Sequence, residues 1–371
     1  MSFSYRSIFC TMILISMLLE ACSSDSDKAE IRPNLPLLEF TDKLQLEEIN
    51  EIHLKEEGKQ AIGTITSIQI AENGDIYLND ESALTVHVYS SDGKFLRRIG
   101  HSGEGPGEFR HNKFIRLSPD RLGVIDVGLK RINFFDLDGN SLETLLLQDS
   151  PEIVTIRGFF DFAPNSNRLY HEAVSPEAFA GEKCSQSFTF VVYNRTLSPI
   201  TLAGEFDPFA SYYCKQLSMV SFVRTDTQGN IFVLPEMVPR ITKYSSRFQK
   251  LDMFNFHTRN WKNPFQPSNR NNVIDFRKTE HSRVLELEIG RKSGRIFIYH
   301  GRQEIESTNK KIKKRIKTYL TVLAPDGQIL LGGATMPLSP VAIDKNEHIF
   351  FIKNSAPNHF TLSRCQLKRI N

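Results

Sequence analysis

Apolar residues in this 371-residue chain come in short runs of four to seven, separated by Gly, Asn and Asp. Runs of this length between turn-forming residues are typical of β-strands, whereas helices need longer segments with a period near 3.6. Beyond the first 21 residues, no stretch of useful length shows the spacing of an amphipathic helix. The pattern therefore predicts an all-β fold.

Two parts of this pattern repeat each other. Residues 74–80 and 121–126 each read as a strand that ends on aspartate, and each is followed by a second strand and an Asp-Gly turn. The offset is 46 residues, measured between Asp80 and Asp126. A period of this length with about four strands per unit predicts a propeller blade, because a lone four-stranded sheet cannot bury both faces and must pack on copies of itself.

Four more degenerate copies follow at residues 168–193, 229–244, 294–328 and 348–362. The last copy lies close to the C-terminus and lacks an outermost strand, which we expect the segment around residues 46–54 to supply. Such closure removes an exposed sheet edge. The sequence thus predicts a six-bladed β-propeller of four-stranded antiparallel blades over residues 40–371, closed by an N-terminal strand and monomeric.

The first residues have the pattern of a targeting segment. Residues 8–19 form a largely apolar run behind Arg6, little more than half of the roughly 20 residues that a membrane-spanning helix needs. Residues 19–22, Leu-Glu-Ala-Cys, resemble the lipobox of bacterial lipoproteins. The resemblance implies a signal peptide over residues 1–21, acylation of Cys22, and a tether over residues 22–39. An ordinary cleaved secretory peptide is the alternative.

The residues after Cys22 refine the expected location. Asp25 and Asp27 resemble the export tag of lipoproteins in the outer leaflet of the outer membrane. Two or three acyl chains anchor a protein stably, because each buried methylene contributes about 0.8 kcal/mol. We therefore expect an outer-membrane lipoprotein on the periplasmic or cell-surface side, with the membrane as a partner through the lipid.

A glycine-rich segment carries a second resemblance. Residues 99–109, Ile-Gly-His-Ser-Gly-Glu-Gly-Pro-Gly-Glu-Phe, resemble the inter-blade signature of NHL-repeat propellers, with a shorter echo at residues 204–206. Together with the lipobox, they make the chain similar to six-bladed TolB-like propeller lipoproteins. The match is specific in the first two blades and architectural from about Ile153 onward. It implies a binding module or, as in some six-bladed propellers, a lactonase or lyase.

Charge and turn chemistry narrow the choice of partner. With 46 basic and 43 acidic residues, the chain has a net charge of +3 and lacks the strong excess of basic residues that is typical of nucleic-acid-binding proteins. The Asp-Gly pairs at residues 92–93, 138–139 and 326–327 lie between apolar runs, which favours hairpin turns over calcium loops. We assign no cofactor and no metal ligands.

Three cysteines remain after the signal peptide and Cys22 are set aside. Cys184 and Cys214 lie in connections that open on the same face of the predicted propeller, so a disulfide between them is one expectation in an oxidising compartment. The alternative is that these two and Cys365 are all buried thiols.

The long insertions gather on that same face, at residues 174–187, 206–219, 256–281 and 300–317. Elaboration of one face of a rigid scaffold favours recognition of a protein, peptide or glycan. The candidate contact residues are Trp261, Arg259, Arg270 and Arg240, since aromatic and arginine side chains dominate binding surfaces. A packed lid without a ligand is the alternative.

The strongest local charge feature is at residues 310–317, where six of eight residues are basic. Lys311, Lys313 and Lys314 form either a solvated hairpin edge or a patch for polyanions such as acidic glycans.

An enzyme is the competing hypothesis. A metal-dependent hydrolase or lyase would use ligands in the central channel, one from each of several blades. The candidates near strand ends are Asp80, Asp126, His171, Glu236 and His300. Their spacing selects no metal set, so three or more of them would have to converge in space to support this hypothesis.

Overall fold

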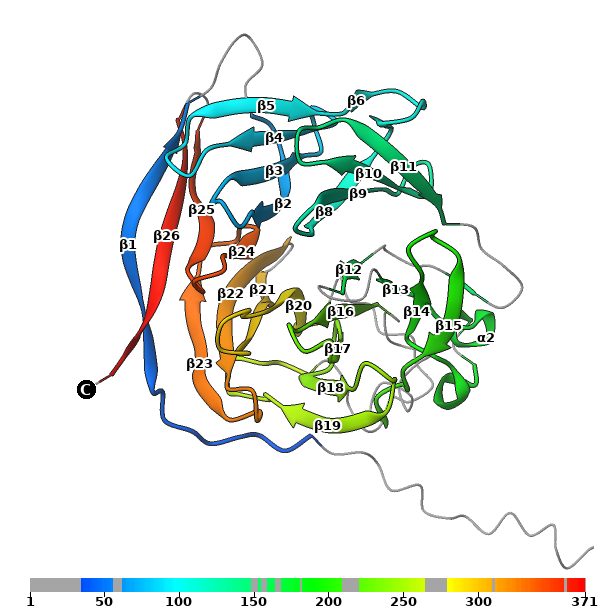
Figure 1. Ribbon diagram of the computed structural model, residues 1–371. Coiled ribbons are helices and arrows are strands. Elements are labelled where there is room, and N and C mark those ends of the chain that lie inside the picture. Colours follow the sequence, from blue (N-terminus) through cyan, green and yellow to red (C-terminus); the bar gives the residue numbers. More distant parts are fainter. Residues whose placement is uncertain are drawn as a thin grey trace, which may run out of the picture. The chain divides into compact units, whose positions relative to one another are not determined.

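Six four-stranded antiparallel sheets follow one another along the chain (Figure 1). The computed structural model describes residues 35–370 except 56–61, 148–152, 155–158, 164–167, 181, 209–219, 264–278, 309–310 and 357–358. The predicted signal peptide, Cys22 and most of the predicted tether lie outside the described residues. No helix in the described part of the chain is long and apolar enough to cross a membrane.

We number the blades in chain order. Blade 1 contains β2 (Ile65–Ile70), β3 (Ile76–Asp80), β4 (Thr85–Tyr89) and β5 (Phe95–Ile99). Blade 2 contains β8 (Asn112–Leu117), β9 (Arg121–Asp126), β10 (Arg131–Asp136) and β11 (Ser141–Leu146). Blade 3 contains β12 (Phe160–Phe162), β13 (Leu169–Glu172), β14 (Phe190–Tyr193) and β15 (Pro199–Ala203).

The longest strands of the ring lie in blades 5 and 6. Blade 4 contains β16 (Ser221–Thr225), β17 (Ile231–Pro235), β18 (Arg240–Tyr244) and β19 (Lys250–Asn255). Blade 5 contains β20 (His281–Ile289), β21 (Ile296–Thr308), β22 (Lys311–Leu323) and β23 (Ile329–Met336). Blade 6 contains β24 (Val341–Ile343), β25 (Ile349–Ala356), β26 (His359–Arg369) and, from the N-terminus, β1 (Leu44–Leu54).

The first strand of each blade is innermost. These six strands contact one another in a closed circle, β2 to β8, β12, β16, β20, β24 and back to β2. The circle closes through β1, which pairs antiparallel with β26 from Leu44 opposite Arg369 to Leu54 opposite Phe360. The predicted six-bladed propeller and its N-terminal closing strand are confirmed.

Burial on both faces explains why the strands read as apolar runs. All five residues of β3 are buried. Ile76 and Leu78 pack in the cluster shared with blade 6, whereas Tyr77 packs in the cluster shared with blade 2. A strand between two neighbouring blades therefore has no polar side, and simple alternation of apolar and polar residues is lost.

The glycine-rich segment forms the crossing from blade 1 to blade 2. It contains the short parallel pair β6 (His101–Ser102) and β7 (Glu108–Phe109). Gly100 has φ of 71°, and a Cβ there would clash with the buried ring of Phe109, so glycine is required. The Arg131 guanidinium donates to the carbonyls of Glu104 at 2.9 Å and Gly105 at 2.7 Å, which fixes the crossing to blade 2.

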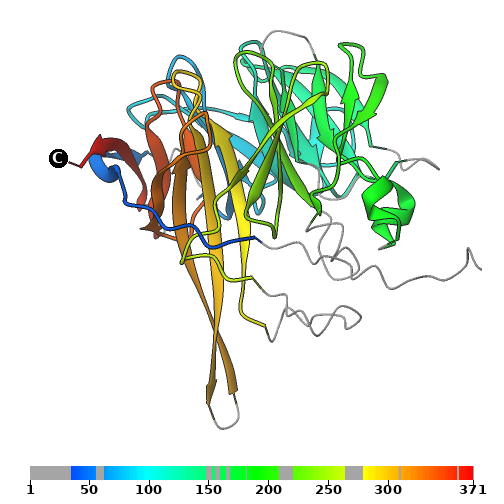
Figure 2. The same ribbon diagram turned by 90° about the horizontal axis from the view of Figure 1, so that it is seen from below.

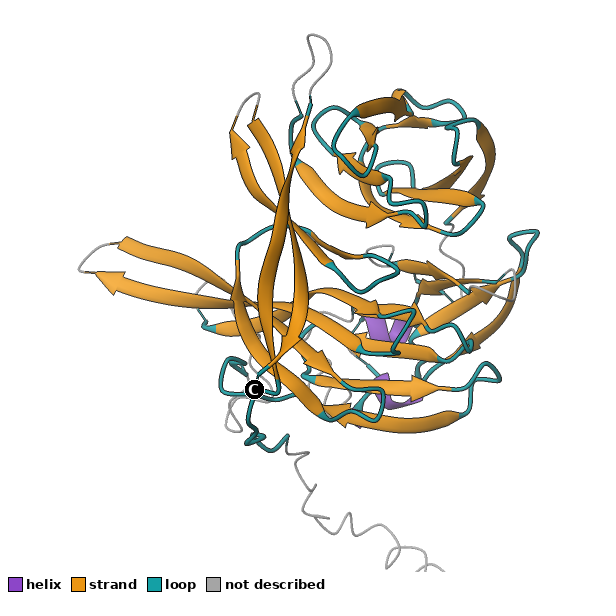
Figure 3. Cartoon of the chain, turned by 60° about the vertical axis from the view of Figure 1, so that its left-hand side comes forward, coloured by secondary structure: helices purple, strands orange, loops and turns teal. Residues whose placement is uncertain are grey.

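The two faces of the propeller differ. One carries the short turns after the first and third strands, where Gly93, Gly139 and Gly327 donate backbone hydrogen bonds three residues back, as expected for hairpin turns. The other carries the crossings and the connections between second and third strands, including α2 (Pro176–Phe179) and the 3-10 turn η1 (Cys184–Gln186) (Figure 3). We call this second face the insertion face.

The largest feature of the insertion face is a hairpin. The segment expected as an insertion at residues 300–317 is a continuation of β21 and β22, which pair from Ile296 opposite Leu323 to Thr308 opposite Lys311. Figure 2 shows this hairpin projecting well beyond the other blades.

Candidate functional site

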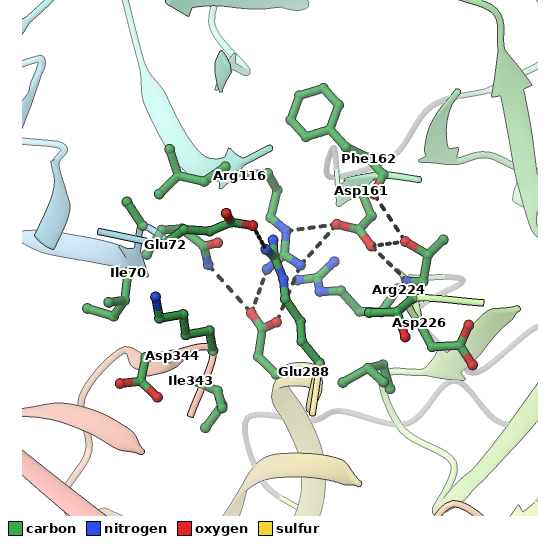
Figure 4. Close-up of a pocket in the computed structure, with 18 residues that line it drawn as sticks. Ile70, Glu72, Arg116, Asp161, Phe162, Arg224, Asp226, Glu288, Ile343 and Asp344 are labelled. Atoms are coloured by element: carbon green, nitrogen blue, oxygen red, sulfur yellow. Dashed lines mark hydrogen bonds and ion pairs between the residues drawn. The ribbon is translucent and has the colours of Figure 1, made fainter. Parts of the chain in front are cut away.

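The centre of the propeller holds a small cavity that all six blades line. It lies where the inner strands end, on the face of the short turns, and has a volume of about 70 Å³. Charged side chains dominate it, with Arg116 from β8, Asp161 from β12, Arg224 from β16 and Glu288 from β20 pointing inward (Figure 4). We call these four residues and Glu286 the central ionic cluster.

Arg116 joins three blades in this cluster. Its guanidinium donates to Asp161 Oδ1 at 3.0 Å and to Glu288 Oε2 at 3.3 Å. Burial alone would lower the pKa of Arg116, but the charges of Glu288 and Asp161 outweigh it and raise that pKa above its ordinary value. The arginine therefore stays charged although it is only 9% exposed.

Arg224 makes the matching contacts on the other side. It donates to the carbonyls of Leu287 and Val223, both at 2.8 Å, and pairs with Glu286. Burial raises the pKa of Glu286, and the nearby Glu288 charge adds to this effect. The second oxygen of Asp161 accepts hydrogen bonds from the Thr225 backbone and hydroxyl at 2.8 and 2.9 Å.

The cluster is thus satisfied largely by its own members. Both guanidiniums and both Asp161 oxygens are used in contacts between blades, so the cluster can link blades 2 to 5 but offers few free donors to a ligand.

Sequence reasoning did not identify this cluster. Its signal is positional, because in blades 1 to 5 the residue before the last of the inner strand lines the central cavity. These five residues are Gln69, Arg116, Asp161, Arg224 and Glu288. A charged residue at the same place in successive degenerate repeats could have indicated it.

The acidic candidates for a metal site lie elsewhere. Asp80 and Asp126 end the second strands of blades 1 and 2, on the insertion face. Asp126 accepts backbone hydrogen bonds from Arg110 at 2.8 Å and from Gly128 at 3.0 Å, which ties the preceding crossing to the following turn. Both carboxylates therefore act within their own blades.

Asp80 is bound in the same way. It accepts from the backbone of Gly63 at 2.7 Å and pairs with His87 at 3.2 Å. Burial would raise the pKa of Asp80, but these hydrogen bonds outweigh burial and lower it. Glu172, another 46 residues beyond Asp126, also ends a second strand but accepts from the backbone of Ser221 in blade 4 at 2.7 Å.

The two histidine candidates are core residues. His171 is fully buried, neither ring nitrogen has a hydrogen-bond partner among the residues that the structure describes, and burial lowers its pKa to about 3. His300 contacts the Thr321 hydroxyl at 3.1 Å, stacks on Tyr319, and also has its pKa lowered to about 3 by burial. Glu236 is buried, and its Oε1 lies 3.9 Å from Nη1 of Arg283.

These candidates do not converge. Among the side chains that the structure describes, no group of three or more His, Cys, Asp or Glu residues is placed to hold a metal ion. The arrangement lends no support to the metal-dependent hydrolase or lyase hypothesis.

The predicted contact residues of the insertion face are distributed differently from expectation. Trp261 is 4% exposed and packs edge-on against Phe256 with ring centroids 5.5 Å apart, so its ring fills the core between blades 4 and 5. Arg240 forms a two-pronged pair with the buried Asp207. Arg259 is exposed, and Arg270 lies outside the described residues.

The basic run lies on β22 and is divided between the two sides of the hairpin. Lys313 stands opposite Glu306 and Arg315 opposite Glu304, whereas Lys314 stands on the other side, opposite Ile305. Lys317 pairs with Glu304 at 2.9 Å. Lys313 and Lys314 are exposed, and the side chain of Lys311 lies outside the described part of the chain.

The cysteines agree with an oxidising compartment. Cys184 is disulfide-bonded, and Cys365 is a buried free thiol. Cys214 lies outside the described residues, so its pairing with Cys184 stays a prediction.

Comparison with known proteins identifies the family. Residues 40–285, more than half of the chain, match the model of a family described as 6-bladed beta-propeller, DUF5128. The chain belongs to this family. A search of curated proteins finds no match.

Solved structures share the fold. A member of the DUF4221 family from Bacteroides vulgatus aligns with a TM-score of 0.65 and 11% identity, covering 89% of this chain and 99% of that one. A protein described as exported from Bacteroides fragilis aligns with a TM-score of 0.56 and 13% identity, covering 89% and 96%. At these identities the likeness shows the fold alone.

Proposed function

We propose that this protein is a lipid-anchored extracytoplasmic binding module that holds a protein, peptide or glycan on its insertion face. The observation that carries the proposal is the β21–β22 hairpin. Beyond Gln303 opposite Ile316 it has left both flanking strands of blade 5 behind, since β20 starts at His281 and β23 ends at Met336. An isolated two-stranded ribbon gains little stability by itself, so its length favours a role in contact with a partner.

The contrast between the faces supports the same choice. The opposite face has short turns, and the central ionic cluster lines the small cavity beneath it. The glycine-rich crossing of blade 1, with its NHL-like residues, belongs to the rigid scaffold because Arg131 and Phe109 hold it.

Export and anchoring belong to the proposal as well. The Leu-Glu-Ala-Cys segment supplies an acylation site at Cys22, and the fold relative from Bacteroides fragilis described as exported agrees with an extracytoplasmic location. We place the protein in the outer membrane, on its periplasmic or cell-surface side.

Affinity capture from native membranes tests the binding role. The anchored protein is compared with a variant in which residues 304–315 are replaced by Asn-Gly, which removes the free ribbon. Lys292→Ala with Lys345→Ala, in short turns of the opposite face, is the matched control. We expect a defined set of membrane components that the shortened variant loses and the control keeps, and identical capture by all three would contradict the proposal.

Anchoring is tested separately. A Cys22→Ala protein should leave the membrane fraction in high salt, and retention there would contradict acylation.

A further inference from the structure

The free ribbon of the β21–β22 hairpin has two chemically different sides. Residues directly opposite in an antiparallel pair share a side, so Glu304, Glu306, Lys313 and Arg315 stand on one side of the free ribbon, with Lys317 on the same side at its base. Their opposite charges compensate one another in part, as the Lys317–Glu304 pair shows.

The other side of the ribbon carries isoleucines together with Lys314. Ile305 and Ile316 lie diagonally across the two strands, with Lys314 opposite Ile305. Ile316 is 40% exposed although β-branched apolar residues usually pack in cores. Leu338, in the crossing from β23 to blade 6 on the same face, is 63% exposed. The insertion face of blade 5 thus presents apolar side chains beside exposed lysines.

The ribbon and its base, residues 302–317, carry surplus positive charge. The described side chains from Arg302 to Lys317 include five basic residues and two acidic ones, and Lys313, Lys314 and Arg315 are exposed. Apolar groups rimmed by cations fit the interface of an anionic bilayer, where isoleucine enters the headgroup region and lysine reaches lipid phosphates.

The start of the described chain lies on this same face. Leu38 donates to the His257 carbonyl at 2.8 Å, and Asn255 donates to the Pro36 carbonyl at 3.0 Å. Both partners lie where β19 runs into the crossing to blade 5. The 12 residues between Cys22 and Leu35 can reach no more than about 45 Å when fully extended.

We infer that the free ribbon is a membrane-contact arm that docks on an anionic lipid surface. The inference rests on the proposed lipid anchor for its setting, since a short tether from the insertion face keeps that face near the bilayer. The free part of β21, Glu304 to Thr308, is about 17 Å long at 3.4 Å per residue, enough to reach from the blades to headgroups. The insertion face then meets partners that reside in the membrane.

Vesicle flotation of unlipidated mature protein carrying Cys22→Ala tests the arm without the anchor. Vesicles contain phosphatidylethanolamine and phosphatidylglycerol at 7:3 (about 30% anionic lipid, in the range that attracts basic segments), or phosphatidylcholine alone. We expect flotation with the anionic vesicles and much less with the neutral ones. Since each lysine near an anionic surface contributes roughly a fivefold gain in binding, Lys313→Gln, Lys314→Gln and Lys317→Gln together should reduce partitioning by at least about tenfold.

Two controls make the result specific. Lys94→Gln, Lys292→Gln and Lys345→Gln remove the same charge from exposed turns of the opposite face and should leave flotation within about twofold. Ile316→Ser should weaken flotation at least about threefold, whereas Leu142→Ser, at a side chain 54% exposed on the outer strand of blade 2, should not. Unchanged circular dichroism and melting temperature verify folding.

Three results would contradict the inference of a membrane-contact arm. The first is that the unlipidated protein does not float with anionic vesicles, and the second is that the two triple lysine variants lose flotation equally. The third is that flotation survives Ile316→Ser combined with the three ribbon lysine changes. A further outcome is that the protein does not bind vesicles but the variant without the ribbon fails to capture a membrane protein that the parent protein captures. That outcome would assign the ribbon to a protein partner instead of lipid. Because these assays omit the anchor, failure of acylation at Cys22 would be seen only in the membrane-fractionation test.

Discussion

Histidine burial is the most consequential feature at the scale of single residues. His171 stands in β13 between blades 2 and 3 with Phe160 and Val191 opposite it in the neighbouring strands. A fully buried imidazole without hydrogen bonds to the described residues is held neutral, which explains why its pKa is lowered to about 3. His171, a candidate metal ligand from the sequence, is therefore a buried core residue that lowers the stability of the fold.

The sign of the pH effect follows from this shift. The unfolded chain takes up a proton on His171 below pH about 6.5, whereas the folded chain does so only near pH 3. His171 therefore does not reduce the free energy of unfolding through protonation above pH about 6.5. Below that pH the free energy of unfolding decreases progressively until about pH 3, because the unfolded chain binds a proton that the folded chain does not.

Replacing His171 with leucine should remove this decrease in the free energy of unfolding at low pH. We expect His171→Leu to raise the free energy of unfolding by about 1 kcal/mol at pH 7, because an unsatisfied buried polar group is removed. Between pH 5.5 and 4 (the interval set by the two pKa values), the dependence on pH should become shallower by about 1.4 kcal/mol per unit. Urea unfolding at several pH values measures both effects, with the exposed His101→Leu as control. An unchanged slope would refute this account.

At the scale of elements, one position per inner strand organises the centre. The ends of the inner strands meet in a ring, so in blades 1 to 5 the residue before the last of the inner strand lines the central cavity. Arg116, Asp161 and Glu288 are bound to one another there although 45 or more residues separate neighbours in sequence. Their pairing links three blades.

Removing the central arginine should be costly. Arg116→Met leaves Asp161 and Glu288 buried without their counter-charge, which we expect to destabilise the fold by about 3–5 kcal/mol. Arg110→Met, at an exposed pair with Glu104, should change stability by less than about 1 kcal/mol. Denaturant unfolding compares the two, and adding Asp161→Asn with Glu288→Gln to Arg116→Met should recover part of the loss. Equal effects at Arg116 and Arg110 would argue against a structural role for the cluster.

At the scale of the whole molecule, ring closure joins the two ends of the described chain. Leu44, Ile52 and Leu54 of β1 are at most 5% exposed, and the strand covers the edge of β26 along its full length (Figure 1). Burial of each such side chain contributes about 1.5–3 kcal/mol, so the three together approach the net stability of a typical domain.

Truncation tests the closure. A chain that begins at Leu35 keeps β1 and should melt cooperatively and elute as a monomer. A chain that begins at Lys55 lacks β1, exposes the edge of β26, and should lose at least about 5 kcal/mol and aggregate. Thermal melting and size-exclusion chromatography distinguish them. If the two chains behave alike, β1 is dispensable for closure.

The sequence by itself determined the blades, because their strands, Asp-Gly turns and 46-residue offset are local properties that survive in degenerate copies. It also indicated closure by the N-terminal strand, since a sixth blade without an outer strand leaves an edge to be covered. The strand extension at residues 300–317 was only partly anticipated, because the segment was expected as an insertion, with a solvated hairpin edge as one interpretation of its basic residues.

Tertiary structure alone decided what meets at the centre and what is buried. The members of the central ionic cluster come from the inner strands of four different blades, and only closure of the ring brings Arg116 beside Glu288. Trp261 was expected on a binding face, but the crossing folds it against Phe256 and His300, which no local pattern encodes. Local sequence specifies backbone conformation through short-range energetics, whereas burial and ionic pairing depend on which distant surfaces the closed ring places together.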